Sequence, residues 1–133
     1  MRGKVLIVED EFLVALQLED ILTDAGYAVV GIVPDRAGVN ELPDSPQVAL
    51  VDLNLRDGPS GPAIAEELAR SHGTTIIYVT ANPGQIHQPA PTAIGVVQKP
   101  FSPQAILGAV AVALGDEKRI SDLSVSFVPV RGG

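Results

Sequence analysis

The stretch VLIVEDE, residues 5–11, places four aliphatic side chains directly before three carboxylates. So short a run of branched apolar residues is typical of a strand that is covered on both faces. The three carboxylates repel one another, and desolvation beside an apolar strand adds to that cost. The stretch therefore predicts a buried strand whose carboxyl end lies near compensating positive charge.

Runs of the same kind recur along the chain, separated by segments with helical spacing or helix-capping signals. The further runs are Ala28–Val33, Val48–Leu53, Thr75–Thr80 and Ile94–Val97, and the predicted helices cover 14–25, 35–42, 62–70 and 102–114. Strands that alternate with helices favour a parallel sheet with right-handed crossovers. The predicted fold is an α/β, doubly wound, five-stranded parallel sheet with helices on both faces.

The connection 81–93 breaks this alternation. It contains three prolines and a glycine between the fourth and fifth predicted strands: Pro83, Gly84, Pro89 and Pro91. Proline removes an amide donor and disfavours helix at the preceding residue. We therefore expect a long loop with at most one helical turn, so that the fourth helix is short or replaced by a loop.

Composition limits the classes of function. The 133 residues carry a formal charge of −7 and contain no cysteine, which excludes disulfides and thiolate metal sites. The acidic balance argues against nucleic-acid binding. No apolar run reaches the roughly 20 residues of a membrane-spanning helix. We expect a cytoplasmic protein with no nucleic-acid or membrane contact.

One domain is expected over residues 1–115, followed by a C-terminal tail, residues 116–133, that forms no separate domain. Four apolar tail residues, Val125, Phe127, Val128 and Val130, leave two interpretations open. They form a short extra strand or pack on the domain, or the tail is a mobile terminus.

Charged and polar side chains follow the predicted strands at their carboxyl ends, where doubly wound sheets bind ligands. Glu9 and Asp10 follow the first strand, and Asp52 lies near the end of the third. These three carboxylates are suitable ligands for Mg²⁺, and an aspartate can act as the nucleophile in aspartyl-phosphate chemistry. Thr80 and Lys99, at the ends of the last two strands, would contact the phosphoryl oxygens.

Each of these residues alone has a commoner explanation. An acidic pair after a strand often begins a solvated helix, Asp52 would suit a turn, threonine is frequent in strands, and Lys99 would suit a solvated position before a turn. Their joint occurrence at four strand ends, in this order, favours a phosphoryl-transfer site.

The motifs VLIVEDE, VALVDLNLRDGPSG, IIYVTA and VVQKPF occur in an order and spacing that resemble the receiver domain of bacterial two-component response regulators, over residues 3–115. The resemblance implies a flavodoxin-like (βα)₅ fold with strand order 2-1-3-4-5. It also implies that Asp52 is the phosphoacceptor, Thr80 the switch hydroxyl and Lys99 the phosphoryl contact, with a cis bond to Pro100.

The same resemblance implies a Mg²⁺ site. Asp10 and Asp52 would bind the ion directly, Glu9 mainly through water, and Asn54 through its backbone carbonyl. The sequence departs from the family at Val96, where an aromatic residue is usual, and in the loop 81–93. These departures resemble an atypical subgroup of receivers found mainly in alphaproteobacteria. They suggest that the loop carries the switch.

The implied function is that of a stand-alone, single-domain response regulator. It would accept a phosphoryl group on Asp52 from a sensor histidine kinase or a histidine phosphotransfer protein, and signal by binding a downstream protein. Its catalysis would be limited to Mg²⁺-dependent self-phosphorylation and autodephosphorylation. A phosphorylation-independent binding module on the same scaffold is the alternative. A phosphohydrolase is disfavoured because Asn54 cannot transfer a proton as general acid or base. His72 and His87 suggest no catalytic role.

Overall fold

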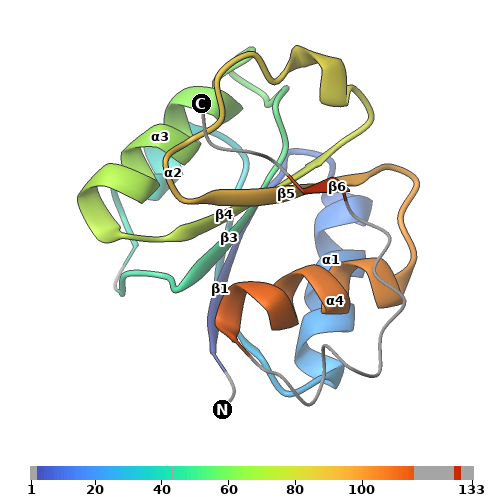
Figure 1. Cartoon of the computed structure of the whole chain (residues 1–133). Helices are drawn as coiled ribbons and strands as arrows, with labels where there is room; N and C mark the ends of the chain where they lie inside the picture. The colour runs from blue at the N-terminus through green and yellow to red at the C-terminus, as the bar shows by residue number, and fades with distance from the viewer. Residues whose placement is uncertain (1–2, 43, 116–127, 130–133) are drawn as a thin grey trace.

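The computed structural model describes residues 3–42, 44–115 and 128–129. One central sheet is covered by helices on both faces (Figure 1). The strands run β1 (Lys4–Val8), β2 (Ala28–Val33), β3 (Val48–Val51), β4 (Thr75–Thr80), β5 (Ala93–Gln98) and β6 (Val128–Pro129). The helices are α1 (Phe12–Asp24), α2 (Arg36–Val39), α3 (Gly61–His72) and α4 (Pro103–Leu114).

The first five strands are parallel and lie in the order β2-β1-β3-β4-β5, which confirms the predicted sheet. The two residues of β6 pair with β5 in the antiparallel direction, with Val128 opposite Val96. A short strand, one of the alternatives that the sequence left open for the tail, is therefore present at Val128 and Pro129. Val125, Phe127 and Val130 lie outside the described residues.

Two apolar clusters hold the layers together. One cluster packs α1 and α4 on the sheet, with Leu18, Leu22 and Ile106 fully buried. The other packs α3 on the opposite face through Ile64 and Leu68. Because both faces of the sheet are covered, its central strands read in the sequence as continuous apolar runs rather than as alternating patterns.

The helix boundaries follow from local chemistry. Ser102 accepts a hydrogen bond from the Ala105 amide at 3.1 Å, and Pro103 occupies the first turn of α4. Gly115 ends that helix with φ of 69°, a left-handed conformation that favours glycine. The helix predicted over 35–42 is present but short: α2 covers Arg36–Val39, capped by Asp35.

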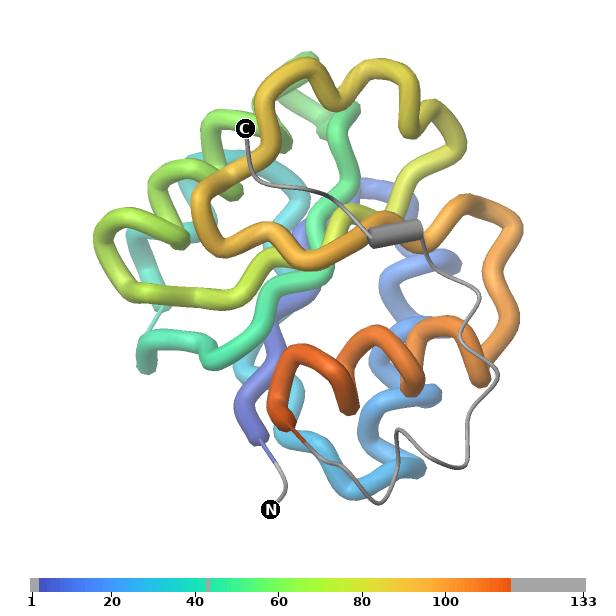
Figure 2. The backbone as a smooth tube through the Cα atoms, in the orientation of Figure 1, coloured from blue at the N-terminus to red at the C-terminus, as the bar shows by residue number. Residues whose placement is uncertain are grey.

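The connection between β4 and β5 contains a single 3₁₀ turn, Pro83–Gln85, as expected. This loop 81–93 extends beyond the carboxyl ends of the strands, beside the segment that follows β3 (Figure 2). The third strand ends earlier than expected, at Val51 rather than Leu53. The Leu53 amide instead donates to the Asp52 side chain at 2.7 Å, a local bond that competes with strand pairing.

Candidate functional site

The sheet register brings the predicted site residues to one edge. Val8 pairs with Val51, so the residues that follow them, Glu9 and Asp52, leave adjacent strands side by side. At the other side of β3, the Lys99 amide donates to the Thr80 carbonyl at 2.9 Å. The peptide bond between Lys99 and Pro100 is cis, as the resemblance implied.

Lys99 joins the carboxylates of the site. Its ammonium nitrogen lies 2.6 Å from Glu9 Oε1 and 3.1 Å from Asp52 Oδ2. A third carboxylate oxygen, Glu11 Oε1, lies 3.7 Å away. The charge of Lys99 therefore offsets part of the repulsion that the acidic stretch after β1 creates.

Asp52 is held at both carboxylate oxygens. Oδ1 accepts from the Leu53 amide, and Oδ2 accepts from Lys99. The residue is only 7% exposed, because β1 and β4 flank β3. These two contacts orient the Asp52 carboxylate, whose hydrogen-bond partners could not be identified from the sequence.

Burial shifts the pKa values of Glu9 and Lys99, the two charged groups beside Asp52. Burial raises the pKa of Glu9 to about 7, although the hydrogen bond and charge of Lys99 oppose this and the Asp52 charge adds to it. Burial lowers the pKa of Lys99, but its bonds to Glu9 and Asp52 outweigh this, so that pKa lies above its usual value. Lys99 is therefore a cation at neutral pH.

The acidic group fits a divalent cation. One carboxylate oxygen each from Glu9, Asp10 and Asp52 lie within 4.8 Å of one another. Oxygens on opposite sides of an octahedral Mg²⁺ are about 4.1 Å apart, and this ion retains several waters. Asp10 is exposed, which leaves room for those waters. Direct ligation by some of these oxygens, and ligation through water by others, is compatible with this spacing.

Two further predicted residues lie at the edge of the site and contact the loop 81–93. The Thr80 hydroxyl is buried and accepts from the Asn82 amide at 3.0 Å. The exposed Asn54 side chain donates to Gln85 Oε1 at 2.9 Å. The site is thus connected to the loop at two points.

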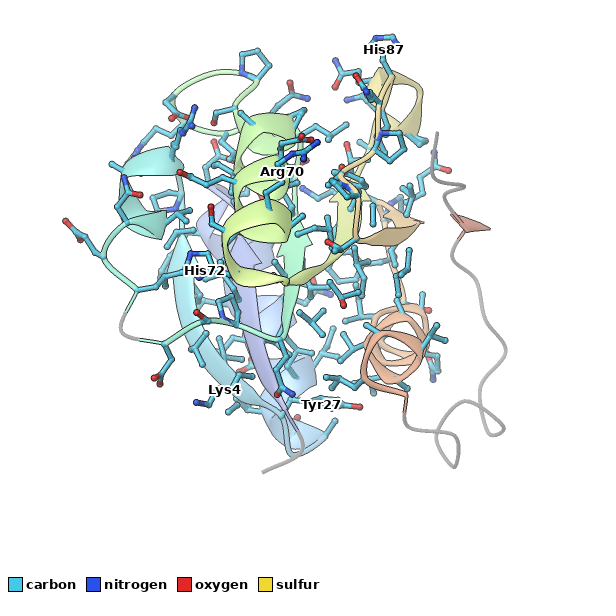
Figure 3. All side chains as sticks on the ribbon, turned by 60° about the vertical axis from the view of Figure 1, so that its left-hand side comes forward. Lys4, Tyr27, Arg70, His72 and His87 are labelled. Atoms are coloured by element: carbon cyan, nitrogen blue, oxygen red, sulfur yellow. The ribbon has the colours of Figure 1, made fainter. Side chains whose placement is uncertain are left out.

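The histidines do not join this group. His87 is exposed on the loop, and His72 at the end of α3 bonds Ser45 through Nδ1 at 2.8 Å (Figure 3). Neither histidine has a hydrogen bond or ion pair to Glu9, Asp52 or Lys99 among the described contacts.

Two residues near the site gave no signal in the sequence. Gln85 belongs to a polar loop with no periodicity, and Tyr78 lies inside an apolar strand. Tyr78 is the register partner of Val96, and its buried hydroxyl accepts from the Ala90 amide at 2.9 Å. The aromatic ring that position 96 lacks is thus present on the neighbouring strand, where it anchors the loop.

The profile of the response regulator receiver domain matches residues 5–111 of this chain. The chain belongs to that family. This explains the strand order and the acidic edge together, since receiver domains of two-component signalling share both.

Proteins called PhyR are among the relatives of this receiver domain. It is 29% identical to the phyllosphere-induced regulator PhyR of Methylorubrum extorquens, over 86% of this chain and 44% of the relative. The solution structure of the PhyR receiver domain of Erythrobacter litoralis aligns with a TM-score of 0.77 and 31% identity, over 85% of this chain and 90% of that one. The crystal structure of the anti-anti-sigma factor PhyR of Bartonella quintana aligns with a TM-score of 0.73 and 30% identity, over 92% of this chain and 51% of that one.

This chain therefore spans about half or less of the full-length PhyR proteins it matches. Among the helices that the structure describes, none is long and apolar enough to cross a membrane.

Proposed function

We propose that this receiver domain accepts a phosphoryl group on Asp52 and signals through protein–protein contacts. The observation that carries the proposal is the orientation of Asp52 by Leu53 and Lys99, beside two further acids suited to a cation. Residues 1–115 would form the working domain and residues 116–133 an appended tail. The location would be the cytoplasm, where histidine kinases present their phosphoryl groups.

The chemistry is a displacement at phosphorus. A carboxylate oxygen of Asp52 attacks the phosphorus of a phosphohistidine, and the bond between phosphorus and the imidazole nitrogen breaks. The nitrogen leaves with the electron pair and takes a proton from solvent. Lys99 stabilises the charge on the phosphoryl oxygens, which develops in a site with little water.

Three other groups would complete the site. Glu9, Asp10 and Asp52, with the Asn54 carbonyl, would hold Mg²⁺, which neutralises phosphoryl charge when bound. The Thr80 hydroxyl would bond a phosphoryl oxygen. It already accepts from Asn82, so a change in its orientation would be transmitted to the first residues of the loop 81–93.

Intact mass spectrometry after incubation with acetyl phosphate tests this function. We expect one phosphoryl adduct that forms with Mg²⁺ and does not form when EDTA is present from the start, because the carboxylate cluster repels a phosphate donor without the ion. NaCl at equal ionic strength, together with EDTA, is the matched control for charge screening, and no adduct should form in it. An adduct of equal yield with EDTA would contradict the Mg²⁺ requirement.

The absence of any adduct on folded protein, sampled at short times, would contradict the proposed phosphorylation. The phosphorylation-independent binding module would then explain the retained scaffold better.

Two exposed apolar side chains suggest where the protein donor docks. Phe12 and Leu13 begin α1 and are 72% and 79% exposed, directly after Glu9, Asp10 and Glu11. Large apolar residues that are exposed together beside a reactive site often form an interface. We propose that the helix carrying the phosphohistidine packs on this pair.

Replacing Phe12 and Leu13 together with serine should slow phosphoryl transfer from a protein donor about tenfold or more, the effect of ~1.4 kcal/mol of lost contact. Transfer is measured with a histidine kinase or phosphotransfer protein that phosphorylates the wild type. Acetyl phosphate is the control, because it needs no docking surface and should react equally with both proteins. An equal loss with both donors would mean that the variant damages the site itself.

The output partner is proposed from the relatives. One PhyR structure is described as an anti-anti-sigma factor, which indicates a protein partner for that molecule. We propose that this chain likewise acts on a downstream protein, with no nucleic acid involved. The loop 81–93 is the candidate element for transmitting the phosphorylation state, because it contacts both Thr80 and Asn54.

A further inference from the structure

The sixth strand occupies part of an otherwise open sheet edge. β5 is the last of the parallel strands, and β6 pairs with it in the antiparallel direction, with Val128 opposite Val96 and Pro129 opposite Gly95 (Figure 1). β6 lies beyond residues 5–111, the part of the chain that matches the receiver family. The family match therefore assigns no role to this strand.

The register of β6 depends on one amide group. In an antiparallel ladder, residue pairs that exchange both backbone hydrogen bonds alternate with pairs that exchange none. Pro129 has no amide hydrogen, so it cannot exchange both bonds with Gly95. Val96 and Val128 are therefore the bonded pair, and the Val128 amide is the donor that this register requires.

The pairing of β6 is short. β5 has six residues, Ala93–Gln98, and within the described part of the chain β6 pairs with two of them. Two backbone hydrogen bonds contribute little net free energy, because water satisfies the same groups when the strands separate. The rest of the β5 edge presents amide and carbonyl groups to which an extended chain can bind. A segment that offers more donors than β6 can therefore displace it.

We propose that the outer edge of β5 is a docking site for an extended segment of a partner protein, and that β6 is a displaceable strand that occupies part of this site. The partner segment would add to the sheet as an antiparallel strand, a mode of recognition in which main-chain hydrogen bonds provide the affinity. The structure shows this kind of occupant, because an extended segment of the chain itself lies there.

A strand that docks on β5 contacts the element between the loop 81–93 and the phosphoryl site. β5 begins at Ala93, where that loop ends, and Lys99 directly follows its last residue. The inference rests on the proposed function only in expecting a protein partner. The docking site itself is tested on the unphosphorylated chain.

Val128→Pro in the full chain removes the amide that pairs with Val96 and should release β6. Val128→Thr is the matched control, because threonine keeps the amide and also favours strands. Each variant is titrated with a synthetic peptide of residues 124–133, SVSFVPVRGG, while the Gly95 and Val96 amides are followed by NMR.

We expect the peptide to shift the Gly95 and Val96 amides of Val128→Pro. Its apparent affinity for Val128→Thr should be about tenfold lower or less, because the attached strand competes there at a high effective concentration. The same peptide with Val128→Pro should shift neither amide. No shift in Val128→Pro, with peptide at about the millimolar effective concentration of an attached strand, would overturn the docking site.

Two further measurements bear on the occupant and on the release of β6. A dimer of Val128→Pro without peptide, detected by sedimentation, would assign the edge to a second copy of this chain and overturn the assignment to a partner. In the wild type, the Val96 amide should exchange its hydrogen at least about tenfold faster than the Ile77 amide of the central strand β4, because release of β6 needs no global unfolding. Equal exchange rates would show that β6 is not displaceable.

Failure of the docking site and failure of the proposed function give different results. Adduct formation with acetyl phosphate and Mg²⁺ is measured in parallel on the wild type and both variants. Loss of the peptide shifts with normal adducts overturns the docking site alone. Absence of any adduct with normal peptide shifts overturns the proposed phosphorylation alone.

Discussion

Replacing Asp52 with asparagine will abolish the phosphoryl adduct that the wild type forms with acetyl phosphate and Mg²⁺. The substitution keeps the shape of the side chain, but an amide is not a nucleophile for phosphorus and cannot form the acyl phosphate. The single side-chain oxygen of asparagine can still accept from the Leu53 amide. The oxygen that accepts from Lys99 is then replaced by an NH₂ group, which cannot accept. We expect adduct occupancy to fall to background in intact mass spectra.

Asp57→Asn is the matched control for that experiment. Asp57 lies in the same connection between β3 and α3, but it is exposed and bonds Ser60 and the Arg36 amide rather than Lys99. Its substitution should leave adduct formation intact. Retention of the adduct in Asp52→Asn at the wild-type level would assign the acceptor to another carboxylate, and peptide mapping would then locate it.

Gly61→Ala should destabilise the protein strongly, although alanine is the better helix former. A Cβ atom at this position would overlap the Asp52 carbonyl oxygen and lie 2.7 Å from the Leu53 Cα. These are backbone atoms of the segment that carries the phosphoacceptor, so no flexible side chain can move aside. We expect a loss of about 3 kcal/mol in the free energy of unfolding, the upper end of the usual cost of overpacking, measured by urea denaturation. Adduct formation should fall as well, because relief of the overlap displaces Asp52.

Gly84→Ala provides the control for a glycine-to-alanine change. A Cβ atom at Gly84 would meet nothing within 4 Å. Its free energy of unfolding should change by less than about 1 kcal/mol, with a small gain possible from reduced freedom of the unfolded chain. Equal stabilities for the two variants would show that the segment after β3 can shift to accept a methyl group.

The parallel sheet and its acidic edge could be predicted because their signals are local. Each strand is a short apolar run, and each site residue lies at the carboxyl end of such a run or shortly after it. The convergence of Glu9, Asp52 and Lys99 then follows from topology alone, since parallel strands present their carboxyl ends at one edge. The loop 81–93 was also predictable, because proline beyond the first turn disrupts a helix whatever the tertiary contacts are.

Other features depend on which strand lies beside which. Val96 stands where the receiver family usually has an aromatic residue. Its register partner on the neighbouring strand, Tyr78, does carry an aromatic ring. No pattern within β4 distinguishes Tyr78 from an ordinary core residue. Its hydroxyl accepts from Ala90, which lies within the proline-rich loop, and local propensities do not determine the path of that loop.

By itself, the sequence determined the order of elements, the absence of an α-helix between β4 and β5, and the identity of the residues at the strand ends. Periodicity, proline chemistry and the position of charge after apolar runs are properties of neighbouring residues. Tertiary structure decided that Lys99 bonds both Glu9 and Asp52, that burial raises the pKa of Glu9 to about 7, and that Gln85 reaches Asn54. Each of these depends on distances and burial created by packing between distant segments, which no local pattern encodes.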